Sequence, residues 1–245
     1  MMDLFFSTAE VPAHAFILFG WAHLFMVLWV ALFGFVLIRM GMKADEGKRK
    51  HLRWVLIVLF VIWEIEWQSW HIVAGDWTPA KHLPLHLCSA MIWVSIYGLL
   101  TRKRWVFALM YFFGIAGAIQ ALITPDSVYA FPHFRMMNTL FSHSLLVISG
   151  FWVIFVEGYR PRVKDIWFCF ITLNVYAVPV YLLNTQLGSH YLYLGAKPET
   201  ASVMDFFPDW PWYFPILQAI LLLLMFAMYW PFAGSSRTET SIAAD

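Results

Sequence analysis

The 245 residues are 61% hydrophobic and 19% aromatic, only 13% are charged, and the mean hydropathy is +0.68. These values lie far outside the range of soluble globular domains and exclude a disordered chain. The formal net charge is +1, and no basic stripe lies outside the connections between apolar segments, so the sequence gives no reason to expect a nucleic-acid partner. We expect an integral membrane protein.

Seven apolar segments, each long enough to cross a bilayer as a helix, are separated by short polar breaks. They predict an all-α, polytopic membrane bundle that forms one domain over residues 1–245. The predicted spans lie near residues 14–38, 54–75, 84–100, 105–124, 138–157, 166–186 and 212–230. No basic residue precedes Arg39, so we expect the first span to be retained rather than cleaved as a signal peptide.

Most Lys and Arg residues lie in the connections after the first, third and fifth spans. The other connections hold only Lys81, Arg135 and Lys197. Because Lys and Arg mark the cytoplasmic side of a membrane, this asymmetry predicts an N-terminus outside and a C-terminus inside.

Polar residues inside the predicted spans gather in their outer halves. Glu64, Gln68 and His71 follow an i, i+4, i+7 spacing and share one face of the second helix. Pro84 is suited to the first position of the third helix, which would put Cys88 about one turn in. Such polar groups by default mark a functional cavity.

Cys88 and His143 are expected at matching depth, because the third and fifth spans both run from outside to inside. A cysteine beside a histidine is the arrangement of an activated nucleophile: the base takes the thiol proton and later returns it to the leaving group. The carbonyl within reach at this depth is a phospholipid ester. The structural alternatives are a packing cysteine and a core histidine.

Three further residues are candidates to orient the histidine or to polarise a carbonyl: Gln120, Asp126 and Asn184. A disulfide is not expected, because Cys88 and Cys169 fall near opposite faces of a membrane about 30 Å thick.

A zinc site formed by His82, His86 and Cys88 is not favoured. Pro84 separates the two histidines, and residues at i and i+2 of a helix, such as His86 and Cys88, point about 200° apart. We therefore expect no metal and no other cofactor.

Several motifs in order resemble the YwaF-like family of bacterial multi-pass membrane proteins, over about residues 50–230. They are the segments at 82–88, 121–126 and 141–144, then Lys197-Pro198, Asp205 and the cluster at 210–213. That family is similar to eukaryotic transmembrane phospholipid acyltransferases. The resemblance implies Cys88 as nucleophile, His143 as base and a bacterial cytoplasmic membrane as the location. Where the family often has an asparagine before a tyrosine, this chain has His190.

The expected function is phospholipid acyl transfer or hydrolysis through an acyl-thioester on Cys88, with a membrane phospholipid or lysophospholipid as partner. The expected supporting or substrate-contacting residues are Glu64, Gln68, His71, His86, Gln120, Asp126 and Asn184. One alternative is a transporter or ligand-binding bundle in which Glu64 relays a proton through the same cavity. Another is a haem protein with His71 and His143 as axial ligands.

Overall fold

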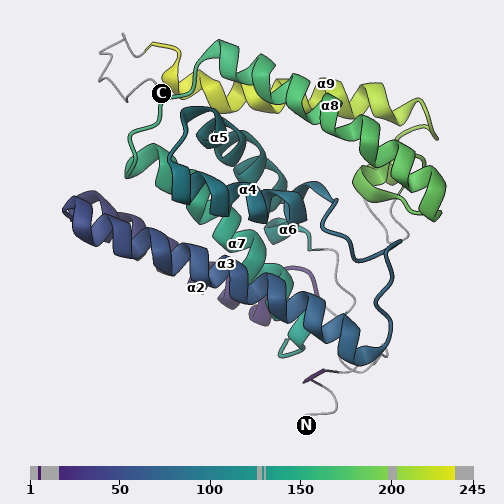
Figure 1. Ribbon diagram of the computed structural model, residues 1–245, viewed down its shortest axis with the longest axis horizontal. Helices are drawn as coiled ribbons and strands as arrows, with labels where there is room; N and C mark the ends of the chain where they lie inside the picture. The colour runs from purple at the N-terminus through teal and green to yellow at the C-terminus, as the bar shows by residue number, and fades with distance from the viewer. Residues whose placement is uncertain (1–4, 7–16, 126–128, 130, 198–202, 235–245) are drawn as a thin grey trace.

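The structure is a computed structural model that describes residues 5–6, 17–125, 129, 131–197 and 203–234 (Figure 1). The regular elements in these ranges are helices, which confirms the all-α prediction. Six helical segments of the described chain are long and apolar enough to cross a membrane: α2 (Trp21–Lys43), α3 (Glu46–Ala74), the continuous segment Arg104–Ile123, α7 (Phe134–Phe155), α8 (Val163–Leu187) and the segment Tyr213–Phe232, which contains α9 (Tyr213–Tyr229). The remaining predicted span, the third one near 84–100, corresponds to α4 (Leu87–Thr101), which is apolar but shorter.

Helix α3 begins well before the predicted span at 54. Asp45 caps its N-terminus: the side chain accepts a hydrogen bond of 2.9 Å from the backbone amide of Lys48. The basic stretch that the sequence suggested as a loop is therefore the first part of a 29-residue helix, which ends at Gly75 in the left-handed conformation (φ 76°).

Helix α4 begins at Leu87, so the prediction that Pro84 is its first residue is wrong. The backbone of His86, the N-cap, is extended (φ −63°, ψ 148°), and residues 84 and 85 form a turn. A short backbone hydrogen bond of 2.7 Å from Leu85 to the carbonyl of Leu83 tightens this turn. Cys88 is consequently the second helical residue rather than a residue one turn inside.

The fourth span changes its winding along its length. It consists of α5 (Arg104–Leu109), the π-helical segment η2 (Met110–Ile115) and α6 (Ala116–Ile123). Neighbouring helices approach η2 closely because they present glycine there: a Cβ on Gly98 of α4 would overlap the Met110 sulfur, and one on Gly150 of α7 would overlap Ile115. This packing fixes α6 beside the first turn of α4.

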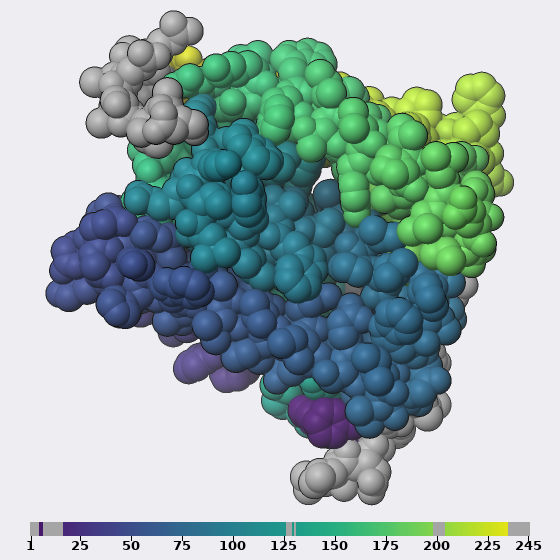
Figure 2. Space-filling view, in the orientation of Figure 1, coloured from purple at the N-terminus to yellow at the C-terminus, as the bar shows by residue number. Residues whose placement is uncertain are grey.

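The helices form two outer pairs around a central group. Figure 1 shows α8 and α9 side by side along one edge, α2 and α3 along the opposite edge, and α4 to α7 between them. The central group supplies fully buried side chains such as Phe112 and Trp152. In the space-filling view the green atoms of α8 and the yellow-green atoms of α9 lie along the upper edge (Figure 2). Apolar residues such as Val175 and Leu223 are exposed on this pair, as expected for positions that contact lipid.

A buried ion network ties the helices together at the end that carries the basic connections. Glu157, whose side chain is 1% exposed, lies 3.0 Å from Arg53 of α3 and 2.9 Å from Arg102, the C-cap of α4. Its carboxylate also accepts a 2.9 Å hydrogen bond from the indole of Trp152. Arg53 in turn pairs with Glu46 at 2.8 Å. Three helices are therefore fastened at this end, opposite to the end where α3 stops and α4 and α7 start.

Candidate functional site

A cavity of about 140 Å³ lies where α3 ends and α4 and α7 begin. Five of the predicted site residues line it together: Glu64, Gln68, His86, Cys88 and His143. The remaining lining residues are Trp63, Trp67, Lys81, His82, Leu83, Pro84, Ser89, Ile92, Asn138, Thr139, Ser142 and Leu146. The matching depth predicted for the cysteine and the histidine thus corresponds to a shared cavity.

Cys88 is held at the start of α4. The first helical hydrogen bond of α4 joins the amide of Ala90 to the carbonyl of His86 at 2.9 Å, so the amides of Leu87, Cys88 and Ser89 precede the helical ladder. On the α6 side, a Cβ added to Gly117 would lie 3.6 Å from the Cys88 sulfur. The thiol therefore belongs to the first turn of α4, and on the α6 side it is next to a residue without a side chain.

The ring of His143 is oriented by its own helix. Its Nδ1 lies 2.7 Å from the backbone carbonyl of Thr139, one turn earlier in α7. A carbonyl oxygen only accepts hydrogen bonds, so Nδ1 carries the proton and Nε2 keeps a free lone pair. The hydroxyl of Ser142 donates to the same carbonyl at 3.1 Å. This tautomer is the one that a general base acting through Nε2 requires.

Glu64 and Gln68 form one hydrogen-bonded unit on α3. The amide nitrogen of Gln68 donates to Glu64 at 3.0 Å and to the backbone carbonyl of His82 at 3.1 Å. The amide oxygen of Gln68 accepts a 2.8 Å hydrogen bond from the indole of Trp77. The predicted stripe on α3 therefore holds the α3–α4 connection, residues 75–86, against the cavity.

The same connection is clamped from the α8 side by two tyrosines. The hydroxyl of Tyr191 donates to the carbonyl of Pro79 at 2.7 Å and accepts from the amide of Leu83 at 3.0 Å. Burial raises the pKa of Tyr191, which keeps this hydroxyl protonated. The hydroxyl of Tyr176 donates to the carbonyl of Leu85 at 3.0 Å. The backbone on both sides of Pro84 is thus fixed by side chains from elsewhere in the chain.

We expect Tyr191→Phe to loosen the α3–α4 connection. The substitution leaves the Pro79 carbonyl and the Leu83 amide without their partner, which costs about 1–3 kcal/mol when such groups are buried. Hydrogen exchange of the peptide that covers residues 79–86 should become faster, while exchange in α2 should stay unchanged. Tyr181→Phe, on the exposed face of α8, is the matched control. Equal protection of residues 79–86 in Tyr191→Phe and wild type would contradict the role assigned to this hydroxyl.

Two of the predicted residues that the structure describes do not line the cavity. The side-chain amide of Asn184 is hydrogen-bonded to the loop after α8. Its nitrogen donates to the carbonyls of Tyr191 and Leu194. Its oxygen accepts from the amide of Tyr191 and the hydroxyl of Ser189. Gln120 is exposed on α6. Asp126 lies outside the described residues. Asn184 and Gln120 were chosen for their depth in a span, and depth alone does not say which way a side chain points.

His71 lies beside the cavity rather than in its wall. Its ring lies against that of His82, tilted by 43° and with 3.9 Å between the centroids, and its Nδ1 lies 2.8 Å from Asp76. The sequence analysis missed Asp76 as a partner of His71, and it missed the carbonyl of Thr139. The i, i+5 spacing of His71 and Asp76 across a helix end was a usable signal for their contact. The contact of His143 with the Thr139 carbonyl has no such signal, because every residue has a backbone carbonyl.

The family model described as the TMEM164 family matches residues 18–229 of the chain. Comparison with curated proteins and with solved structures gave no match.

Proposed function

The chain belongs to the TMEM164 family of multi-pass membrane proteins, and we propose that it is a lipid-modifying enzyme in which Cys88 and His143 carry phospholipid acyl transfer. The observation that carries this proposal is that both side chains line one cavity, with the Nδ1 of His143 occupied by a backbone carbonyl. The resemblance to YwaF-like proteins, and through them to transmembrane acyltransferases, points in the same direction.

The first half-reaction forms an acyl-enzyme. Nε2 of His143 takes the thiol proton, and the Cys88 sulfur attacks the ester carbonyl of a phospholipid. When the tetrahedral intermediate collapses, the C–O bond breaks and the lysophospholipid oxygen leaves with the proton from His143. The product is a thioester on Cys88 and a free lysophospholipid.

The second half-reaction returns the enzyme to its starting state. The hydroxyl of a lysolipid acceptor gives its proton to His143 and attacks the thioester, the C–S bond breaks, and the Cys88 sulfur regains the proton. With water in place of the acceptor, the same steps release a fatty acid. Transfer and hydrolysis therefore share the nucleophile and the base and differ only in the acceptor.

Backbone amides at the start of α4 are the donors that we assign to the oxyanion. The amides of Cys88 and Ser89 precede the first helical hydrogen bond and lie next to the nucleophile. Fixed donors at the position where negative charge develops are the largest single contribution in many acyl-transfer enzymes. This assignment replaces Gln120 and Asn184, whose side chains do not line the cavity.

The cavity is smaller than the usual range of about 300–1,000 Å³ for ligand pockets. A volume of about 140 Å³ admits the ester and part of the glycerol unit, so the acyl chains of a bound lipid would stay in the bilayer. The basic connections lie at the other end of the bundle, and the positive-inside rule then assigns the cavity to the outer leaflet. The setting that we propose is the bacterial cytoplasmic membrane.

The direct test is the intact mass of the detergent-purified full-length protein after incubation with phospholipid. We expect a fatty-acyl adduct on the wild type that hydroxylamine releases, as it does a thioester, and no adduct on Cys88→Ala. Cys169→Ala is the matched control, because Cys169 is a buried free cysteine far from the cavity lining.

An adduct that survives Cys88→Ala, or that is lost equally in Cys169→Ala, would overturn the assignment of the nucleophile. If no adduct forms and Cys88→Ala retains full function in cells, the cavity instead serves as a site for a small-molecule ligand. In that case Glu64→Gln, which removes the buried carboxyl group that could relay a proton, is the variant expected to abolish function.

A further inference from the structure

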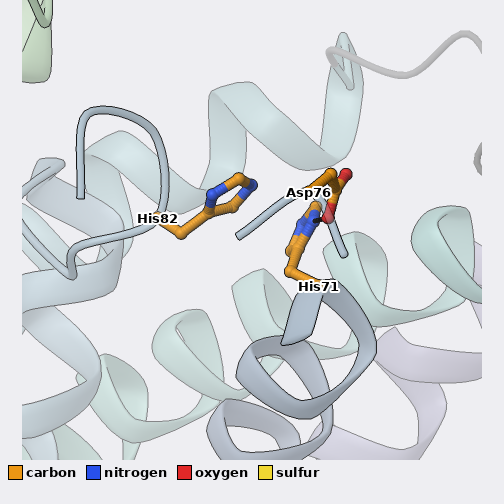
Figure 3. A group of neighbouring side chains, drawn as sticks. All are labelled: His71, Asp76 and His82. Atoms are coloured by element: carbon orange, nitrogen blue, oxygen red, sulfur yellow. Dashed lines mark hydrogen bonds and ion pairs between the residues drawn. The ribbon is translucent and has the colours of Figure 1, made fainter. Parts of the chain in front are cut away.

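The end of α3 and the connection after it bring two histidines and an aspartate together outside the cavity wall (Figure 3). Ligand atoms of His71, Asp76 and His82 lie within 4.8 Å of one another. His71 comes from the last turn of α3, Asp76 follows the Gly75 C-cap, and His82 points toward His71 from the connection. Tetrahedral ligands at about 2.0–2.1 Å from an ion are roughly 3.4 Å apart. Because the 4.8 Å limit exceeds this spacing, the side chains would rotate on binding an ion.

One atom in this cluster is unsatisfied. Among the residues that the structure describes, the buried Nε2 of His71 has no hydrogen-bond partner, and the residue as a whole is 4% exposed. On the other side of the ring, Nδ1 lies 2.8 Å from the carboxylate of Asp76. A carboxylate accepts, so Nδ1 carries the proton and Nε2 presents a lone pair without a donor. Buried polar atoms of this kind are rare and call for an explanation, such as an ion.

We propose that His71 and His82 bind a divalent transition-metal ion, with Asp76 holding His71 in the ligating tautomer. A ligating histidine usually donates its other N–H to a carboxylate, which is the arrangement of His71 and Asp76 here. Water completes the coordination. This inference does not depend on the proposed acyl transfer, because its test is binding of the ion.

The donor set selects the class of ion. Imidazole nitrogens suit Zn²⁺, Cu²⁺, Ni²⁺ and Co²⁺, whereas Ca²⁺ and Mg²⁺ require several oxygen ligands, and Asp76 is the single carboxylate of this cluster. The cations Lys81 and Arg135 act on these rings and oppose a bound ion, whereas Asp76 favours it.

Binding would change the α3–α4 connection. In the structure the Nδ1 of His82 accepts a 3.0 Å hydrogen bond from the amide of Thr78. If Nδ1 coordinates the ion, its lone pair is used; if Nε2 coordinates, Nδ1 must carry the proton. In both cases the Thr78 amide loses its acceptor. Because the carbonyl of His82 is held by Gln68 and His82 lines the cavity, the ion would act on the wall of the cavity.

Titration of the full-length, tag-free protein in detergent with Co²⁺ tests the site. Co²⁺ is a visible probe for a site that takes Zn²⁺, and its absorption bands report nitrogen coordination. We expect one equivalent to bind to the wild type, Zn²⁺ to displace it, and His71→Gln and His82→Gln each to weaken binding by at least about tenfold. We expect Asp76→Asn to weaken binding by about 10–100-fold, as loss of an orienting carboxylate does.

His190→Gln is the matched control, because His190 is an exposed histidine in the loop after α8, outside this cluster. The control should bind Co²⁺ as the wild type does. A wild type without visible bands, or bands of equal strength in His71→Gln, would overturn the proposal. Bands that disappear only in His190→Gln would do the same.

Discussion

Replacement of His143 by glutamine is expected to slow formation of the acyl-enzyme by about 10²–10⁴-fold, the usual contribution of a general base. Glutamine keeps a polar side chain near the carbonyl of Thr139 but offers no nitrogen that can take the thiol proton. The variant should still fold, because the ring is not part of the ion network that fastens the helices. The measurement is the initial rate of adduct formation by intact mass, together with the thermal melting temperature.

The pH dependence separates a base from a packing residue. In the His143→Gln variant only thiolate formed by solvent can attack, so the residual rate should rise with pH over the range in which the wild type has already levelled off. Ser142→Ala is the matched control: it removes a neighbouring hydroxyl that shares the Thr139 carbonyl and leaves the imidazole in place. A rate in His143→Gln equal to that of wild type at every pH would remove His143 from the mechanism.

The largest expected effect on stability comes from Glu157→Gln at the opposite end of the bundle. The substitution leaves Arg53, whose side chain is 8% exposed, with Glu46 as its remaining partner. Removal of one member of a buried ion pair typically costs about 3–5 kcal/mol, and we expect about 3 kcal/mol here because Glu46 still compensates in part. The midpoint of denaturant-induced unfolding in detergent measures this loss.

Two controls test whether the loss comes from an uncompensated charge. Lys48→Gln breaks an exposed ion pair with Asp45 at the same end and should leave the midpoint unchanged. The double variant Arg53→Met with Glu157→Met removes both charges and should recover much of the stability lost in Glu157→Gln, since apolar replacement of a whole buried pair is often neutral. A double variant less stable than Glu157→Gln would argue against this account.

Hydropathy and spacing were sufficient for the all-α bundle, for seven apolar helices and for a polar cluster at one end. Depth in two spans that run in the same direction was enough to expect Cys88 near His143, and both line the cavity, although Cys88 is the second residue of α4 and His143 lies more than two turns into α7. Glu64 and Gln68 were found through helical periodicity, since residues at i and i+4 lie on the same face of a helix and contact the same neighbours. These inferences needed the local backbone geometry and nothing about tertiary packing.

The remaining differences come from contacts that no local pattern encodes. Asn184 lies at a suitable depth, but its amide is satisfied by the loop after α8. Pro84 would fit a helix start, yet the turn is fixed by Tyr191 and Tyr176 from distant parts of the chain. For a metal the sequence pattern drew attention to His82, His86 and Cys88, whereas the structure groups His82 with His71 and Asp76 through the geometry at the end of α3.

The carbonyl of Thr139 has a consequence for genetics. In many nucleophile–histidine enzymes a third side chain orients the base, and its loss is visible in mutagenesis. Here the orienting atom belongs to the backbone, one helical turn before His143, and every amino acid supplies it. A saturation scan of α7 should therefore show no position, apart from His143 itself, at which every substitution is as damaging as the loss of Cys88 or His143. Position 139, one turn before the histidine, lines the cavity and should accept small residues that preserve the helix, whereas proline or glycine there would act through helix geometry.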